Sequence, residues 1–107
     1  MALFSIKNIG LAGISAAVPQ NEESNFDYDR LSENERKLLI KTTGIETRRI
    51  APTGLTTSDL CFAAAENLFE SLGWLKKEIQ IAIFLSQSPD YHLPATAIIL
   101  QDRLGLS

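Results

Sequence analysis

Two side chains in this 107-residue chain are of types that commonly serve as catalytic nucleophile or base: its single cysteine, Cys61, and its single histidine, His92. Cys61 shares an apolar helical stripe with Ala64 and Leu68, where a thiol usually packs as a small apolar group and is inert. His92 stands in a polar loop without a second candidate base. We therefore predict that Cys61 is a core residue, that His92 is a surface residue, and that neither is catalytic. One cysteine and one histidine also provide no cluster for a metal.

A second feature with chemical potential is a concentration of positive charge in an acidic chain. The net charge is -3, yet residues 36–49 hold five basic residues against one acidic residue, Glu46. The basic residues are Arg36, Lys37, Lys41, Arg48 and Arg49. Such a patch can meet phosphates or an acidic protein surface, and it can equally be an ordinary solvated helix face followed by strand-edge arginines. Adjacent strand residues point to opposite faces, so at most one of the two neighbouring arginines can serve a phosphate site.

Composition excludes several broad classes of protein. With 45% hydrophobic and 21% charged residues, the chain can build an apolar core and is not a disordered sequence. The small negative charge gives no global field for nucleic acid or an anionic membrane, and no apolar run reaches the ~20 residues that cross a bilayer. One cysteine permits no internal disulfide, so we expect a reducing, cytoplasmic setting without nucleic-acid or membrane partners.

Helical and extended patterns alternate along the chain. Residues 6–17 are rich in Ile, Leu, Ala and Gly with few charges, which predicts a strand. The stretch loosely imitates a secretory signal, but Asn8, Gly10 and Gly13 interrupt it and it lacks a basic start. Ser32 and Glu35 form a capping-box pattern that predicts a helix over residues 33–42, ending at Gly44. Residues 47–50 predict a short strand.

The second half of the chain continues the alternation. Capping oxygens at residues 57–59 predict a helix that ends at Gly73, and the apolar run 79–85 predicts a strand covered by helices on both faces. A helix follows from Pro94 to Leu104 and stops at Gly105. The order is that of an α/β layered fold, which we interpret as one incomplete domain over residues 1–107. Functional groups in such folds lie on loops past the strands, here the polar segment 86–94.

Several short strings occur together in one order. They are Ile9-Gly10-x-x-Gly13-Ile14, Val18-Pro19, Thr43-Gly44-Ile45-x-x-Arg48-Arg49, Thr57-Ser58-Asp59-Leu60, Ser86-Gln87-Ser88-Pro89-Asp90-Tyr91-x-x-Pro94-Ala95 and Leu100-Gln101-x-x-Leu104-Gly105-Leu106. In this order the chain resembles the N-terminal segment of β-ketoacyl-acyl-carrier-protein synthase III, a condensing enzyme of the thiolase fold. The resemblance covers essentially all 107 residues.

The resemblance implies an acyltransferase that performs a decarboxylative condensation in fatty-acid or related lipid or polyketide biosynthesis. A cysteine takes an acyl group from acyl-CoA, and malonyl on an acyl carrier protein supplies the carbanion. In the family, that cysteine and the assisting histidine and asparagine lie outside the part that this chain matches, so we expect these residues alone to be inactive. The resemblance also implies a homodimer and no cofactor beyond the thioester substrate.

The resemblance assigns substrate-binding positions to the cationic helix, its C-terminal end and one loop. These are Arg36, Lys37, Lys41, Thr42, Thr43 and Leu93. Familiar members of the family carry a tryptophan at the position of Leu38 and an arginine at that of Thr42, so the acyl donor here is expected to be a carrier thioester or an unusual CoA ester. Leu93 stands where many members have phenylalanine, which favours a longer or branched primer, unless Leu93 only packs under its own loop.

Three interpretations remain open at this stage. The chain is the N-terminal piece of an active condensing enzyme, a non-catalytic module that binds a carrier protein or dimerises, or a self-contained small α/β protein. The apolar Leu106 directly after a helix end favours the first interpretation.

Overall fold

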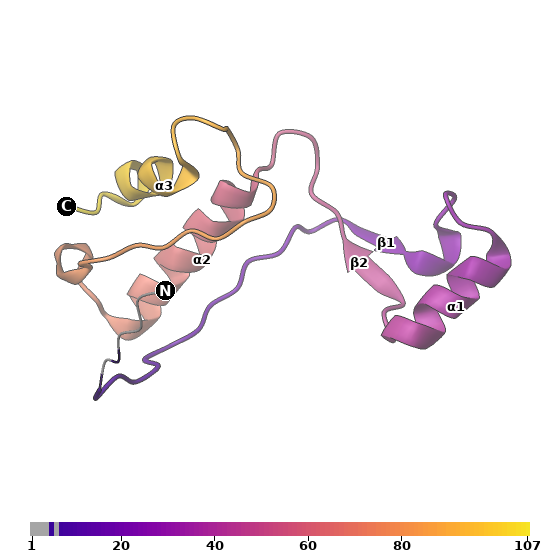
Figure 1. The fold of residues 1–107 in the computed structure, drawn as a ribbon, viewed down its shortest axis with the longest axis horizontal. Coiled ribbons are helices and arrows are strands. Elements are labelled where there is room, and N and C mark those ends of the chain that lie inside the picture. The colour runs from indigo at the N-terminus through magenta and orange to yellow at the C-terminus, as the bar shows by residue number, and fades with distance from the viewer. Residues whose placement is uncertain (1–4, 6) are drawn as a thin grey trace.

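The computed structural model describes residue 5 and residues 7–107. In this part of the chain the elements are β1 (Glu22–Ser24), the 3-10 helix η1 (Asn25–Asp27), α1 (Glu33–Thr43), β2 (Thr47–Arg49), α2 (Thr57–Leu72), the 3-10 helix η2 (Lys76–Glu78) and α3 (Thr96–Leu104). They form two groups (Figure 1). We call β1, η1, α1 and β2 the distal lobe, and α2, α3 and the loop 86–95 before α3 the helical lobe.

The distal lobe is built on an antiparallel pair of short strands. Glu22 lies opposite Arg49 and Glu23 lies opposite Arg48, so each pair places unlike charges side by side. The predicted strand at residues 47–50 is confirmed as β2, whereas β1 arises in a stretch whose polar sequence gives no strand signal.

Helix α1 begins and ends where its capping signals predict. The Glu35 carboxylate accepts hydrogen bonds from the Ser32 amide at 2.8 Å and the Ser32 hydroxyl at 2.6 Å. At the other end Gly44 has φ 70°, a left-handed conformation that glycine adopts without a steric cost, and its amide bonds back to Ile40 at 2.8 Å.

The helical lobe joins α2 to α3. The N-cap of α2 is Thr56, one residue before the predicted capping stretch, and the helix ends at Gly73 as predicted. Helix α3 packs on α2 and ends at Gly105, also as predicted. Its Leu100 and Leu104 are the two hydrophobic residues that are buried within the described part of the chain.

The two long strands predicted for residues 6–17 and 79–85 are not paired strands here, which corrects that prediction; residue 6 itself lies outside the described residues. Both runs are extended, but a strand also requires a hydrogen-bonded neighbour, and no neighbouring strand for them exists among residues 7–107. The first run nonetheless packs on α2. A Cβ added at Gly13 would lie 3.0 Å from Leu68 and 3.1 Å from Leu72.

The arrangement leaves much apolar surface uncovered. The radius of gyration is 18.3 Å, against about 13 Å for a compact domain of this length. The accessible surface is 8945 Å², against about 5,900 Å² for a compact monomer of this mass. In the run 79–85, Ile83 is 89% exposed and Leu85 is 96% exposed. Among the described residues, no helix is both long and apolar enough to span a bilayer.

Candidate functional site

The outward side of α1 presents a mixed cationic and apolar surface. Residues at helical spacing along it are all exposed: Lys37, Leu38, Lys41, Thr42 and Ile45, which directly follows the helix. We call these five residues the α1 outer face. Lys37 is paired with Glu33 one turn earlier, and this bond holds the pKa of the Glu33 carboxyl below its usual range. Lys41 forms no ion pair within residues 7–107, so its charge is free to meet an anion.

Arg36 lies on a different side of the helix from the α1 outer face. Its side chain is half-buried, and its Nε is buried without a hydrogen-bond partner among the described residues. Helix α1 turns this side toward η1, together with the half-buried Leu39 and Ile40. The predicted substrate-binding residues Arg36 and Lys41 are therefore separated by the helix itself.

The turn after α1 is held by the hydroxyl of Thr43. This hydroxyl donates to the Leu39 carbonyl at 2.7 Å and accepts from the Ile45 amide at 3.2 Å. It thus satisfies one carbonyl at the helix C-terminus and orders the residues that follow. Thr42, by contrast, leaves its side chain on the exposed surface.

A buried asparagine fixes the same turn from the other side. Asn25 is 5% exposed; its side-chain amide donates to the Ile45 carbonyl at 2.9 Å and its backbone amide donates to the Glu46 carbonyl at 2.7 Å. Its side-chain oxygen accepts from Arg48 at 2.7 Å. Sequence reasoning missed Asn25, because the partners lie about twenty residues away and leave no local signal.

The two neighbouring arginines are neutralised rather than available. Arg48 pairs with Glu23 at 2.8 Å and lies 4.1 Å above the Tyr28 ring. Arg49 pairs with Glu22 at 3.1 Å and donates to the Gln20 carbonyl at 2.9 Å. Their positive charge therefore stabilises the distal lobe instead of forming an anion site.

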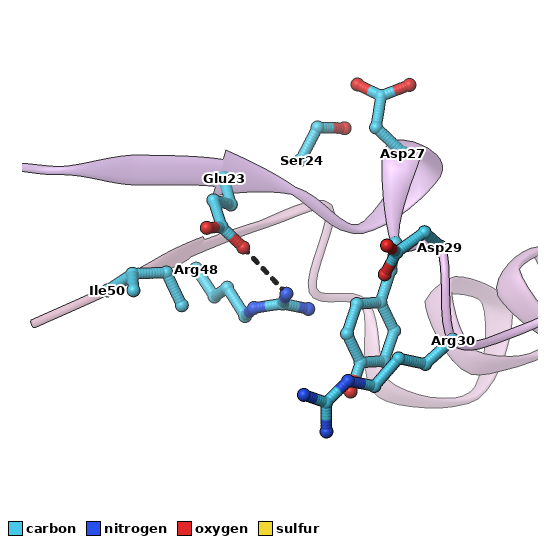
Figure 2. A pocket seen from close by; sticks show the side chains of 8 residues that line it. Glu23, Ser24, Asp27, Asp29, Arg30, Arg48 and Ile50 are labelled. Carbon is cyan, nitrogen blue, oxygen red and sulfur yellow. Dashed lines mark hydrogen bonds and ion pairs between the residues drawn. The ribbon is translucent and has the colours of Figure 1, made fainter.

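A pocket lies beside β1 and β2 (Figure 2). It has a volume of about 880 Å³ and is lined by Glu23, Ser24, Asp27, Tyr28, Asp29, Arg30, Arg48 and Ile50. Three carboxylates outnumber two guanidinium groups on its walls, so it offers no net positive field to a phosphate. None of the six predicted substrate-binding residues lines it.

Leu93 lies far from α1. Helix α1 lies at the right of Figure 1, whereas the loop that leads into α3 lies beyond β1 and β2 toward the left. Leu93 is 86% exposed, so it does not pack under its own loop in this structure. Within this chain, Leu93 and the α1 outer face are therefore not parts of one site.

The loop that carries Leu93 is tied to α2 through part-buried polar groups. Ser58 is completely buried, and its hydroxyl donates to the Asp90 carboxylate. Arg103 of α3 donates to the same hydroxyl at 2.9 Å and pairs with Asp59 at 2.9 Å. Hydrogen bonds from Thr56, with a further contribution from Arg103, hold the pKa of the Asp59 carboxyl below its usual value.

The two classical catalytic residue types stand apart. Cys61 is half-buried on α2 and is a free thiol, and His92 is exposed on the loop before α3. They belong to different elements, and neither forms a side-chain hydrogen bond within residues 7–107. His92 is thus a surface residue as predicted, Cys61 is only half-buried, and the absence of a catalytic role for either stays a prediction.

Comparison with known proteins shows what the chain is similar to. No family model matches the chain. It is 33% identical over 96 residues to the β-ketoacyl-[acyl-carrier-protein] synthase III of Geobacillus kaustophilus, covering 90% of the chain and 31% of that protein. A solved 3-oxoacyl-(acyl-carrier protein) synthase from Burkholderia xenovorans superposes with a TM-score of 0.82 and 39% identity, over 90% of this chain and 28% of that chain. The Thermus thermophilus synthase III gives a TM-score of 0.79 at 31% identity, covering 92% of this chain and 30% of that one. The chain thus spans about a third of the length of the relatives that it matches.

Proposed function

Because the chain is similar to β-ketoacyl-[acyl-carrier-protein] synthase III and has the corresponding segment of its thiolase-like α/β fold, we propose that it forms part of a condensing acyltransferase. In the proposed reaction, an acyl group leaves its CoA or carrier thiol and a malonyl carrier thioester loses CO2. The new carbon–carbon bond yields a 3-oxoacyl carrier thioester, and the donor thiol is released. The pathway proposed is fatty-acid or related lipid synthesis.

The observation that carries this proposal is the similarity over nine-tenths of the chain, in both sequence and structure. The α1 outer face adds support from chemistry. Lys41 offers positive charge on the same face as the apolar Leu38, and both CoA and acyl carrier proteins present phosphate or carboxylate groups. Leu38 cannot stack on adenine as an indole does, which favours a carrier thioester or an unusual CoA ester as acyl donor.

The activity is tested on the full-length protein. We expect a 3-oxoacyl product when the protein is incubated with acyl-CoA or acyl-carrier donors and malonyl carrier protein, with one CO2 released per product. Absence of product across short, long and branched donors would reject the proposed function. Residues 1–107 alone should give no product and no acylation of Cys61.

The α1 outer face is tested by charge reversal. Lys41→Glu should raise KM for the thioester or carrier substrate about fivefold with little change in kcat, because it replaces attraction to an anion by repulsion. The matched control is Lys77→Glu on η2, an exposed lysine outside the distal lobe. Equal effects of both variants on KM and on its salt dependence would show that the α1 outer face is an ordinary solvated surface without a role in substrate binding. Arg36 is less suited to this test because it is half-buried.

A second candidate function is a non-catalytic module that binds a carrier protein or dimerises. The observation in its favour is the large uncovered apolar surface, since extended exposed patches mark missing partners. Carrier-protein binding without condensation by the full-length protein would select this candidate. We also propose a homodimer for the full-length protein, which sedimentation tests directly; a monomer at working concentrations would contradict it.

A further inference from the structure

Residues 87–95, which we call the strap, run along the surface of the helical lobe before α3. Every residue of the strap except Asp90 is exposed, and Asp90 is half-buried. The chain is better covered on either side of the strap, because Ser86 is half-buried and Thr96, the first residue of α3, is only 4% exposed. The strap is therefore a surface segment with one side chain turned toward the rest of the lobe.

Two side chains of the strap bond to α2 within the described chain. Asp90 accepts hydrogen bonds from the Ser58 backbone amide at 3.3 Å and from the Ser58 hydroxyl, and Ser58 is completely buried. The Ser88 and Thr57 hydroxyls lie 3.3 Å apart in an exposed position. Water can replace an exposed hydroxyl contact at little cost, whereas part-buried bonds to a carboxylate are stronger. Asp90 is thus the main anchor of the strap.

Helices α2 and α3 are joined by contacts that involve no residue of the strap. Arg103 of α3 pairs with Asp59 of α2 at 2.9 Å, and its guanidinium carbon lies 4.8 Å from the centroid of the Phe62 ring. Helix α3 packs on α2 and carries the buried Leu100 and Leu104. The two helices can therefore stay together when Asp90 is released.

Ser58 connects the anchor of the strap to the contact between the helices. Arg103 Nη1 donates to the Ser58 hydroxyl at 2.9 Å, and that hydroxyl donates to Asp90. We call Ser58, Asp90 and Arg103 the Ser58 cluster. If Asp90 leaves, the Ser58 hydroxyl keeps its bond from Arg103, and the Ser58 amide, which lies in the first turn of α2 and has no helical acceptor, turns to water. Release of the strap therefore strands no charged group.

We propose that the strap is a conformational device closed by a single latch, the pair of Asp90 and Ser58, and that it opens as a unit while α2 and α3 stay packed. The structure shows the closed state. Opening uncovers the start of α2 and leaves Arg103 paired with Asp59. The device is independent of the proposed function, because it is defined by contacts within the helical lobe.

The latch is tested by limited proteolysis of the full-length protein with chymotrypsin. Cleavage after Tyr91, which is 62% exposed, is followed by mass spectrometry of the fragment that begins at His92. A protease needs several neighbouring residues in a mobile, extended form, so the cleavage rate reports how often the strap is open.

Asp90→Ala should raise this rate about tenfold, because it removes both bonds to Ser58. Ser58→Ala should raise it in the same direction by a smaller factor, since the backbone amide can still donate to Asp90. The matched control is Ser88→Ala, which removes the other bond of the strap to α2 and should leave the rate unchanged within about twofold. An unchanged rate in Asp90→Ala would overturn the proposal, as would an equal increase in Ser88→Ala, because the strap would then have no single latch.

The independence of the helices is tested by amide hydrogen exchange of α3. Its amides should exchange as slowly in Asp90→Ala as in the unmodified protein, but about tenfold faster in Arg103→Met, which breaks the pair with Asp59. Faster exchange of α3 in Asp90→Ala would overturn the proposal, because the strap and the helices would then open together. Neither measurement depends on condensing activity, so both outcomes stand whether or not the proposed function is correct.

Discussion

The two lobes of this chain are held together by different kinds of interaction. In the distal lobe, ion pairs between β1 and β2 and the bonds of Asn25 fix the turn after α1, and none of its hydrophobic residues is buried. In the helical lobe, Leu100 and Leu104 are buried and a polar cluster locks the helices. Exposed ion pairs contribute little free energy, whereas buried apolar area contributes much. Substitutions in the helical lobe should therefore lower stability mainly through lost apolar burial, and those in the distal lobe mainly through lost hydrogen bonds and ion pairs.

The largest expected effect lies in the packing of the helical lobe. Leu104→Ala, at a residue that is 6% exposed, should lower the free energy of unfolding by about 2–5 kcal/mol, because it removes transfer free energy and leaves a cavity. The comparison substitution in the distal lobe, Leu38→Ala at 63% exposure, should cost no more than about 0.5 kcal/mol. Urea denaturation of both variants measures the difference. Similar costs would show that the lobes are not held differently.

A smaller effect is expected where the distal lobe depends on a buried polar side chain. Asn25→Ala should cost about 1–3 kcal/mol, because the Ile45 carbonyl and Arg48 lose a partner in a poorly hydrated place. The control is Asn21→Ala, at an exposed asparagine directly before β1, and it should be near neutral. Thermal denaturation compares the two. Equal melting temperatures for both variants would show that the hydrogen bonds of Asn25 do not stabilise the distal lobe.

The contact between the first extended run and α2 gives a matched pair of glycines. Gly13→Ala should destabilise by about 1 kcal/mol, since the added Cβ meets Leu68 at 3.0 Å and Leu72 at 3.1 Å. A Cβ added at Gly10 has no atom within 4 Å. Gly10→Ala should therefore be neutral or stabilise the protein by about 0.5 kcal/mol, because alanine lowers the conformational entropy of the unfolded chain. Equilibrium unfolding separates the two outcomes, and a stabilising alanine at position 13 would contradict the packing.

The smallest effect is the response of the helical lobe to acid. Because the pKa of Asp59 is lowered on folding, its contribution to stability is complete above its ordinary value near 3.8 and is lost as the pH falls through the folded-state value. Asp59→Asn should therefore make stability less sensitive to pH below about 4. Unfolding followed from pH 6 to pH 2 checks this, with Asp102→Asn, an exposed aspartate on α3, as control. An unchanged acid profile for Asp59→Asn would mean that its bonds to Thr56 are not retained in solution.

Sequence could predict the features that depend on neighbours along the chain. The Ser32–Glu35 capping box and the glycines that end the helices were all placed correctly, because their partners are within four residues. The strands predicted for the apolar runs 6–17 and 79–85 are absent from the described residues 7–17 and 79–85, because apolar composition indicates burial but does not supply a neighbouring strand. The bonds of Asn25 and the Ser58 cluster join residues that are 20 to 45 positions apart, and no local pattern marks them. The substrate-binding roles of the α1 residues stay predictions.

The pairing of β1 with β2 has a consequence for how this chain can vary. Because Ser24 lies opposite Thr47, residues 25–46 form a closed excursion that leaves and re-enters the molecule at one place. Helix α1 is carried entirely within that excursion, and it packs against η1, which is carried there too. The segment can therefore be exchanged as a unit. A different helix could replace α1 while β1 and β2, on either side of the segment, keep their positions. Swapping residues 25–46 for the matching segment of a relative should therefore replace α1 and η1 without rebuilding the helical lobe.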